Sequence, residues 1–118
     1  MTSKWLIPVV AGVAASLAIA LPAFAGPTAS TVKVTAGKPA ELKFTVLPKT
    51  VTKGTVTFKV TNRGALSHDF KIGGKVTPLL KPGKTATLKV TLKAGKAKYL
   101  CTVPGHAAAG MRGVITVK

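Results

Sequence analysis

Hydrophobic and polar residues alternate with a period of two along most of the chain after Gly26. Successive side chains of a β-strand point to opposite faces, so this alternation predicts strands with one buried and one solvent-facing side. The alternating segments are 32–36, 42–46, 56–60, 88–92 and 115–117, and turns rich in glycine and proline separate them. Seven to eight short strands without a helical segment predict an all-β fold, a two-sheet antiparallel β-sandwich or Greek-key barrel.

The first 25 residues are typical of an export signal. Lys4 precedes an apolar run that ends at Leu21, and Ala23 and Ala25 stand where a signal peptidase requires small residues. We therefore expect a cleaved signal peptide at 1–25, a flexible leader at 26–30 and one domain at 31–118, in a protein that is periplasmic or secreted. An uncleaved membrane anchor is the alternative, because about 20 apolar residues can span a bilayer.

Basic residues far outnumber acidic ones, with 18 Lys and Arg against 2 Asp and Glu and a formal net charge of +16. Outward-facing lysines keep strands soluble, but the excess also predicts an anionic partner: an acidic docking face, or peripheral contact with an anionic membrane or cell wall. Nucleic acid is not expected, because no interleaved basic and aromatic residues provide a platform for stacking bases. With Glu41 and Asp69 as the only carboxylates, paired-carboxylate hydrolysis is excluded, and we expect no enzyme.

The residues suited to binding a soft metal are few and lie close together in the sequence. Cys101, His106 and Met111 follow one another in the spacing Cys-x4-His-x4-Met, and His68 lies upstream at the start of an expected strand, 68–72. Two imidazoles and a thiolate with a weak thioether suit one copper ion that cycles between Cu(I) and Cu(II). Taken singly, the Cys and Met are ordinary core residues and the His an ordinary surface or core residue.

Other uses of this set fit less well. A structural zinc site usually has four nitrogen or thiolate ligands, and zinc seldom uses Met. A haem bound by His and Met would need an attachment motif or a helical pocket, and both are missing from the sequence. A catalytic Cys–His pair would need an orienting carboxylate or an oxyanion hole, and no motif for either lies near the pair.

The segment 99–111, together with 67–70 before it, resembles the cupredoxins, the small type 1 (blue) copper proteins of the plastocyanin, azurin and rusticyanin kind. The resemblance implies an eight-stranded Greek-key sandwich with copper at one end. It implies His68, Cys101 and His106 as equatorial ligands and Met111 as the axial ligand. It also implies that His106 is the electron port.

Two further expectations follow from the resemblance. The small apolar residues around His106 would form a docking rim; they are Pro104, Gly105, Ala107, Ala108 and Ala109. Asp69 stands where the family often has Asn, and it would tether the two ligand segments through the backbone near Thr102. The Cys-to-His spacing is longer than in plastocyanin-like loops and closer to that of rusticyanin.

The function expected from these features is a soluble, monomeric one-electron carrier outside the cytoplasm. Its redox partner would be a cytochrome or an oxidase with an acidic docking face. One alternative is a copper chaperone or storage protein that delivers copper to an oxidase. A second is a basic polyanion-binding or adhesion module.

Overall fold

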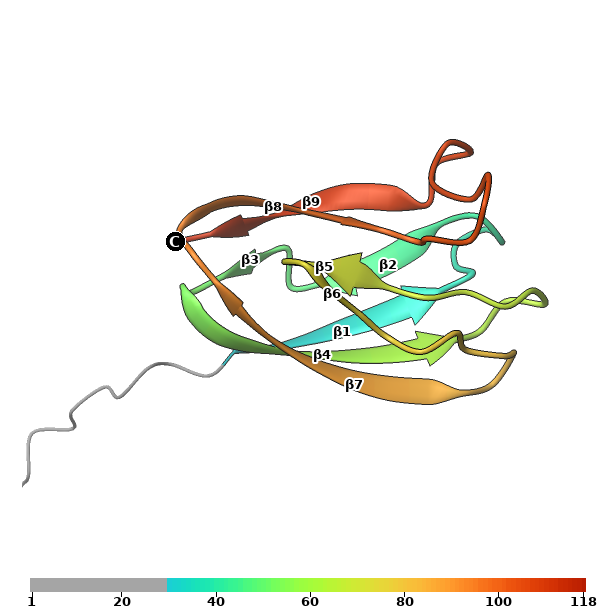
Figure 1. Ribbon diagram of the computed structural model, residues 1–118, viewed down its shortest axis with the longest axis horizontal. Coiled ribbons are helices and arrows are strands. Elements are labelled where there is room, and N and C mark those ends of the chain that lie inside the picture. Colours follow the sequence, from blue (N-terminus) through green and yellow to red (C-terminus); the bar gives the residue numbers. More distant parts are fainter. Residues whose placement is uncertain (1–29) are drawn as a thin grey trace, which may run out of the picture.

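The computed structural model describes residues 30–118, which form two β-sheets that face each other (Figure 1). The first sheet has the order β2-β1-β4-β7 and consists of β1 (Ser30–Ala36), β2 (Phe44–Leu47), β4 (Gly54–Asn62) and β7 (Thr85–Leu92). The second has the order β3-β9-β8-β5-β6 and consists of β3 (Thr50–Val51), β5 (Lys71–Ile72), β6 (Lys75–Val76), β8 (Gly95–Leu100) and β9 (Arg112–Val117). The expected all-β sandwich is confirmed.

The strands differ from expectation in number and direction. The described part contains nine strands, because β3 and β6 are two-residue pairings too short for alternation to reveal. β5, also of two residues, is the end of the expected strand 68–72. Most neighbours are antiparallel, but β1 pairs with β4 and β3 pairs with β9 in parallel. The parallel pairs arise because the chain crosses to the second sheet at β3 and returns, so β4 runs in the same direction as β1 beside it.

The alternation predicted which side chains are buried. The inward positions of the long strands form the core: Val32, Val34, Val56, Phe58, Val60, Val90, Ile115 and Val117. Lys33, Lys59 and Lys89, at the intervening positions, are exposed as expected. Burial of the inward face is the main favourable term that holds the two sheets together.

An aromatic cluster connects this core to one end of the sandwich. The ring of Phe70 lies 5.3 Å from that of Phe58 and 5.4 Å from those of Phe44 and Tyr99, measured between centroids. Such separations allow favourable edge-to-face and tilted contacts. Since Phe70 follows His68 and Asp69 directly in the chain, the cluster fixes the position of the backbone that leads to them.

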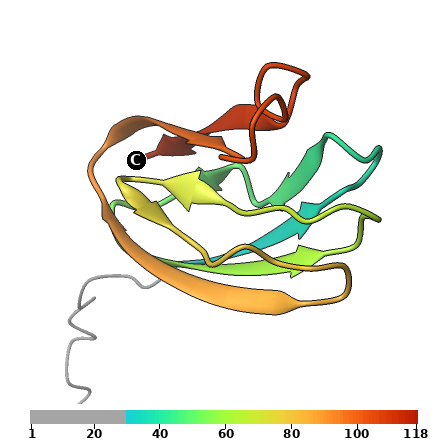
Figure 2. The same cartoon turned by 45° about the vertical axis from the view of Figure 1, so that its right-hand side comes forward.

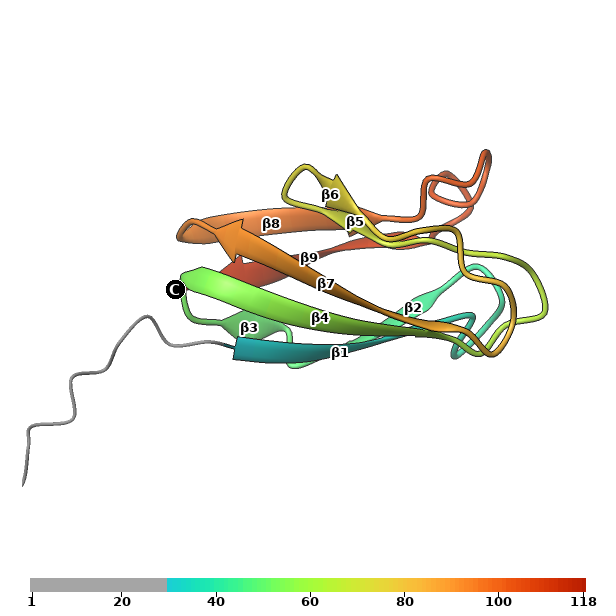
Figure 3. The same ribbon diagram turned by 60° about the horizontal axis from the view of Figure 1, so that its bottom comes forward.

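Four connections lie together at the end of the sandwich opposite the C-terminus: residues 37–43, 63–70, 77–84 and 101–111 (Figures 1 and 3). Figure 2, in which this end comes forward, shows the connection between β8 and β9 rising above the others. The predicted segment 68–72 is shorter than expected as a strand. His68 instead forms an isolated antiparallel bridge with Leu80, and β5 begins at Lys71.

Asn62 holds two of these connections together. Its buried side-chain amide donates hydrogen bonds to the carbonyls of Leu66 and Leu80, each at 2.8 Å, and its side-chain oxygen accepts one from the backbone N–H of Gly64 at 2.9 Å. The structure shows a buried amide whose three bonds set the distance between the segments on either side of it.

The predicted signal peptide at 1–25 lies outside the described residues, as does the predicted leader except for Ser30, which begins β1. Within residues 30–118, no helix is long and apolar enough to cross a membrane.

Candidate metal centre

His68 is fixed on both its backbone and its ring. Its backbone N–H donates to the carbonyl of Leu80 at 3.0 Å, and the N–H of Leu80 donates back at 2.7 Å. The side chain is fully buried. Its Nε2 lies 2.9 Å from a carboxylate oxygen of Glu41, and its Nδ1 lies 3.2 Å from Nδ1 of His106. The ring therefore contacts a carboxylate through one nitrogen and faces the second histidine with the other.

Cys101, His106 and Met111 are brought together by the connection between β8 and β9. Cys101 follows the last residue of β8, and its N–H donates to the carbonyl of Met111 at 3.0 Å. The N–H of Met111 donates to the carbonyl of His106 at 3.0 Å. These two bonds close the loop on itself, and the turn at its tip contains Gly105 with a φ of 83°, a backbone conformation that glycine adopts without strain.

The donor atoms of His68, Cys101 and His106 all lie within 4.8 Å of one another. The thiol sulfur of Cys101 is 3.6 Å from Nδ1 of His106. Met111 is fully buried and packs in one small cluster with Cys101 and Ala36, against Phe44 and Val103. The structure thus brings the three predicted equatorial residues into one group and places the predicted axial residue in the cluster that surrounds the thiol.

Exposure differs among the four residues. His68 and Met111 are 0% exposed and Cys101 is 1% exposed, whereas His106 is half-buried. Beside it, Pro104, Gly105, Ala108 and Ala109 are exposed and Ala107 is half-buried. Solvent or a docked protein therefore reaches this group of residues on the side of His106.

Asp69 links the two segments that carry the site, as expected. Its Oδ1 accepts a hydrogen bond from the backbone N–H of Thr102 at 2.6 Å, and the Thr102 hydroxyl donates to Oδ2. Burial raises the pKa of the Cys101 thiol, and the Asp69 charge acts in the same direction, while backbone hydrogen bonds from Asp69 and Val103 oppose the rise. Without a metal, the site thus favours a protonated thiol, and a bound cation would have to displace that proton.

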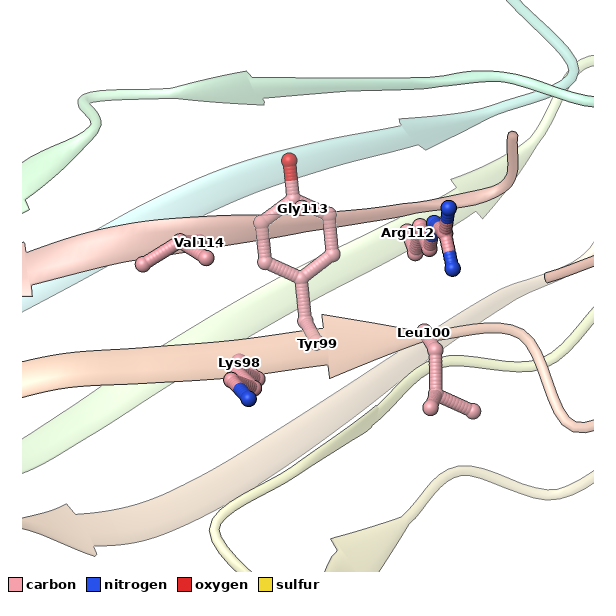
Figure 4. Close-up of a pocket in the computed structure, with 6 residues that line it drawn as sticks. All are labelled: Lys98, Tyr99, Leu100, Arg112, Gly113 and Val114. Carbon is pink, nitrogen blue, oxygen red and sulfur yellow. The ribbon is translucent and has the colours of Figure 1, made fainter. Parts of the chain in front are cut away.

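A cavity of about 510 Å³ lies elsewhere on the molecule, along β8 and β9. Figure 4 shows Tyr99 reaching from β8 across Gly113 of β9, beside Lys98, Leu100, Arg112 and Val114. None of the four predicted ligands lines this cavity, so it is separate from the site.

The comparisons with known proteins agree with this geometry. The family model described as copper binding proteins, plastocyanin/azurin family, matches residues 28–118. The chain belongs to this family. It is a cupredoxin, and copper is the metal its site binds. Cupredoxins of this kind transfer electrons to redox partners, so the family and the His–Cys–His group together point to a blue copper electron carrier.

Solved structures show the same fold. Rusticyanin from Thiobacillus ferrooxidans is 25% identical, with a TM-score of 0.67 over 79% of each chain. Reduced auracyanin from Roseiflexus castenholzii is 26% identical, with a TM-score of 0.57 over 79% of this cupredoxin and 99% of that chain. Auracyanin A, a "blue" copper protein from Chloroflexus aurantiacus, is 23% identical, with a TM-score of 0.62 over 77% of this cupredoxin and all of that chain. A comparison with curated protein sequences finds no match.

Sequence reasoning did not identify Glu41 as a site residue. No local motif marks it, since it lies in an ordinary connection between two strands. The one signal is scarcity: a chain with 18 basic residues has only two carboxylates, and both lie at this site.

Proposed function

We propose that this cupredoxin is a one-electron carrier in which His68, Cys101 and His106 are the equatorial copper ligands and Met111 is the axial ligand. The observation that carries the proposal is the convergence of two imidazoles and a thiolate within 4.8 Å. Copper bound there would supply the Cu(I)/Cu(II) couple. The protein's part is to hold these donors in one arrangement for both oxidation states, so that little reorganisation accompanies electron transfer.

The donor set favours copper over zinc. A thiolate and a thioether stabilise Cu(I), and the imidazoles bind both oxidation states. Among residues 30–118, no carboxylate belongs to the group formed by His68, Cys101 and His106. A closed zinc site would instead need a fourth nitrogen, oxygen or thiolate donor.

The half-buried His106 is the proposed route for the electron. With the other three residues buried, its edge offers the shortest contact between the site and a docked protein. The small residues beside it allow close approach without bulky side chains, as in a short-lived docking contact. No catalytic step on a substrate is proposed.

Burial also favours electron transfer over copper delivery. A chaperone passes its metal on by ligand exchange, and an incoming donor would have to reach ligands that are at most 1% exposed, apart from His106. Transfer of copper to a metal-free acceptor would therefore be slow, whereas reduction by a cytochrome in a stopped-flow experiment would be fast. The reverse order of the two rates would favour the chaperone.

We further propose that the protein is exported, with cleavage after Ala25, and works as a monomer in the periplasm or outside the cell. The composition of residues 1–25 supports this proposal. A redox partner with an acidic face is the counterpart that the basic surface favours.

An optical titration of the mature protein with Cu(II) tests the ligand set. We expect an intense thiolate-to-copper absorption band that is lost in Cys101→Ser. Thr87→Ser, on an exposed position of β7, is the control and should keep the band. A pale, weak spectrum of the unaltered protein, or a band that survives in Cys101→Ser, would contradict a blue site. Circular dichroism of each metal-free variant shows whether the sandwich is retained.

A further inference from the structure

Both carboxylates of this chain lie at one end of the sandwich, and they meet different ligand segments. Asp69 bonds to the segment that follows Cys101. Glu41, in the connection between β1 and β2, bonds to His68 through Oε1 at 2.9 Å. Among residues 30–118, the structure contains no other contact of this kind between a carboxylate and a basic side chain.

The Glu41 carboxylate is held in place by backbone groups of the segment that leads to His68. Its Oε2 accepts a hydrogen bond from the N–H of Ala65 at 2.9 Å, and its Oε1 accepts one from the N–H of Leu66 at 2.7 Å. The two bonds, one to each oxygen, fix the orientation of the carboxylate and direct both oxygens.

Glycine makes this approach possible. A Cβ at Gly64 would lie 2.6 Å from Oε1 and 2.7 Å from Oε2 of Glu41. A Cβ at Gly37, in the same connection as Glu41, would lie 2.4 Å from the Cα of Gly64. The two connections thus touch backbone to backbone, and this close crossing brings the carboxylate within reach of the buried ring.

The contact determines which ring nitrogen is free. Both oxygens of Glu41 accept hydrogen bonds from backbone N–H groups, and Oε1 also faces Nε2 of His68 at 2.9 Å. With the carboxylate as acceptor, Nε2 of His68 carries the proton. The lone pair of a neutral ring then lies on Nδ1, the nitrogen that faces His106. A carboxylate on the outer nitrogen of a metal-ligating histidine also makes the ring a stronger donor.

We propose that Glu41 is a positioning residue that orients His68, selects its Nε2–H tautomer and stabilises Cu(II) relative to Cu(I). This inference rests on the proposed role of His68 as a ligand. Loss of such an outer contact typically weakens metal binding about 10- to 100-fold. If the affinity for Cu(II) falls tenfold and the affinity for Cu(I) is unchanged, the reduction potential of this one-electron couple rises by about 59 mV.

The test compares Glu41→Ala, which removes the contact, with Glu41→Gln, which keeps an acceptor oxygen but no charge. We expect Cu(II) affinity to fall in the order wild type, Gln, Ala, and the reduction potential to rise in that order. Thr91→Lys, at an exposed position of β7, changes the net charge by the same +1 away from the site and should leave both quantities unchanged. If Glu41→Ala does not fold, the Gln variant alone still tests the potential.

Nitrogen-15 NMR of the His68 ring in the metal-free protein gives a readout that is independent of copper. We expect the Nε2–H tautomer in the wild type at a pH where the ring is neutral, and its loss in Glu41→Ala. An unchanged tautomer in Glu41→Ala together with an unchanged potential in Glu41→Gln would overturn the inference. Failure of the wild type to form a blue site would instead overturn the proposed ligands, and the NMR result would still report on the contact.

Discussion

Tyr99 is a single side chain whose ionisation can be followed by itself, because the chain has no other tyrosine. Its ring packs against Phe44 and Phe70, and burial raises its pKa above the ordinary value of 10.0. The unfolded chain ionises first as pH increases, so the contribution of the neutral phenol to stability is complete below pH 10 and is lost above it.

We predict that the ultraviolet absorbance of the Tyr99 phenolate appears with a midpoint above pH 10 in the folded protein. Tyr99→Phe is the matched control, since it keeps the ring and cannot ionise. The free energy of unfolding of Tyr99→Phe minus that of the wild type should be constant below pH 10 and should increase at higher pH, because only the wild type loses stability there. A phenolate midpoint at or below 10 would show that the ring is not buried as described.

The four proposed ligands were predicted from residue types and their spacing, and the structure brings the donor atoms of three of them together. His68, Cys101, His106 and Met111 are the two histidines, the one cysteine and the one methionine after the first residue, so few other combinations existed. Glu41 could not be predicted, because its role depends on the crossing of two connections far apart in sequence. Asp69 was predicted only through family resemblance, which supplied its partner near Thr102.

At the scale of the elements, alternation predicted strands at β1, β2, β4, β7 and β9 together with their inward faces, since burial of one face leaves a period-two pattern. β8 (Gly95–Leu100) was not among the alternating segments. Alternation could not predict β3 and β6, which have two residues each and are too short to have a period. Nor could it predict that β1 and β4 pair in parallel, because side-chain alternation is the same for either direction.

The buried amide of Asn62 shows how β4 and the connections beside it depend on each other. We predict that Asn62→Ala destabilises the metal-free protein by about 1–3 kcal/mol. The carbonyl of Leu66 and the N–H of Gly64 would lose their partner, and the carbonyl of Leu80 would keep only its bond from the N–H of His68. The measurement is urea unfolding followed by circular dichroism.

Thr61→Ala is the control for Asn62→Ala. It removes the hydroxyl contact with Thr85 in the adjacent position of the same strand pair, and that contact is exposed. Exposed substitutions of this kind usually change stability by about 0.5 kcal/mol or less. Equal losses in the two variants would show that the buried amide has no special part in joining the connections.

For the whole molecule, the dominant property is a positive charge that internal ion pairs do not neutralise. The carboxylate side chains of Glu41 and Asp69 are occupied at the site, which leaves the surface lysines of residues 30–118 free to act on approaching molecules. The electrostatic field of these positive charges accelerates the encounter with a negatively charged partner, and dissolved salt screens it.

We predict that electron exchange with an acidic redox protein slows by on the order of tenfold or more as ionic strength rises from about 0.01 M to about 1 M. Stopped-flow absorbance of the copper band measures the rate. An uncharged small reductant is the control, and its rate should hardly depend on salt. A protein partner whose rate is equally insensitive to salt would remove the electrostatic part of the proposal.

The position of the Cys101–Met111 segment, between β8 and β9, has a consequence for how the protein matures. The N–H of Cys101 bonds to the carbonyl of Met111, and Met111 leads directly into β9. A chain in which β9 has not yet docked would therefore contain His68 and most of the sandwich without the closed segment that completes the site. We expect the metal to bind after β9 has joined the sheet and not before.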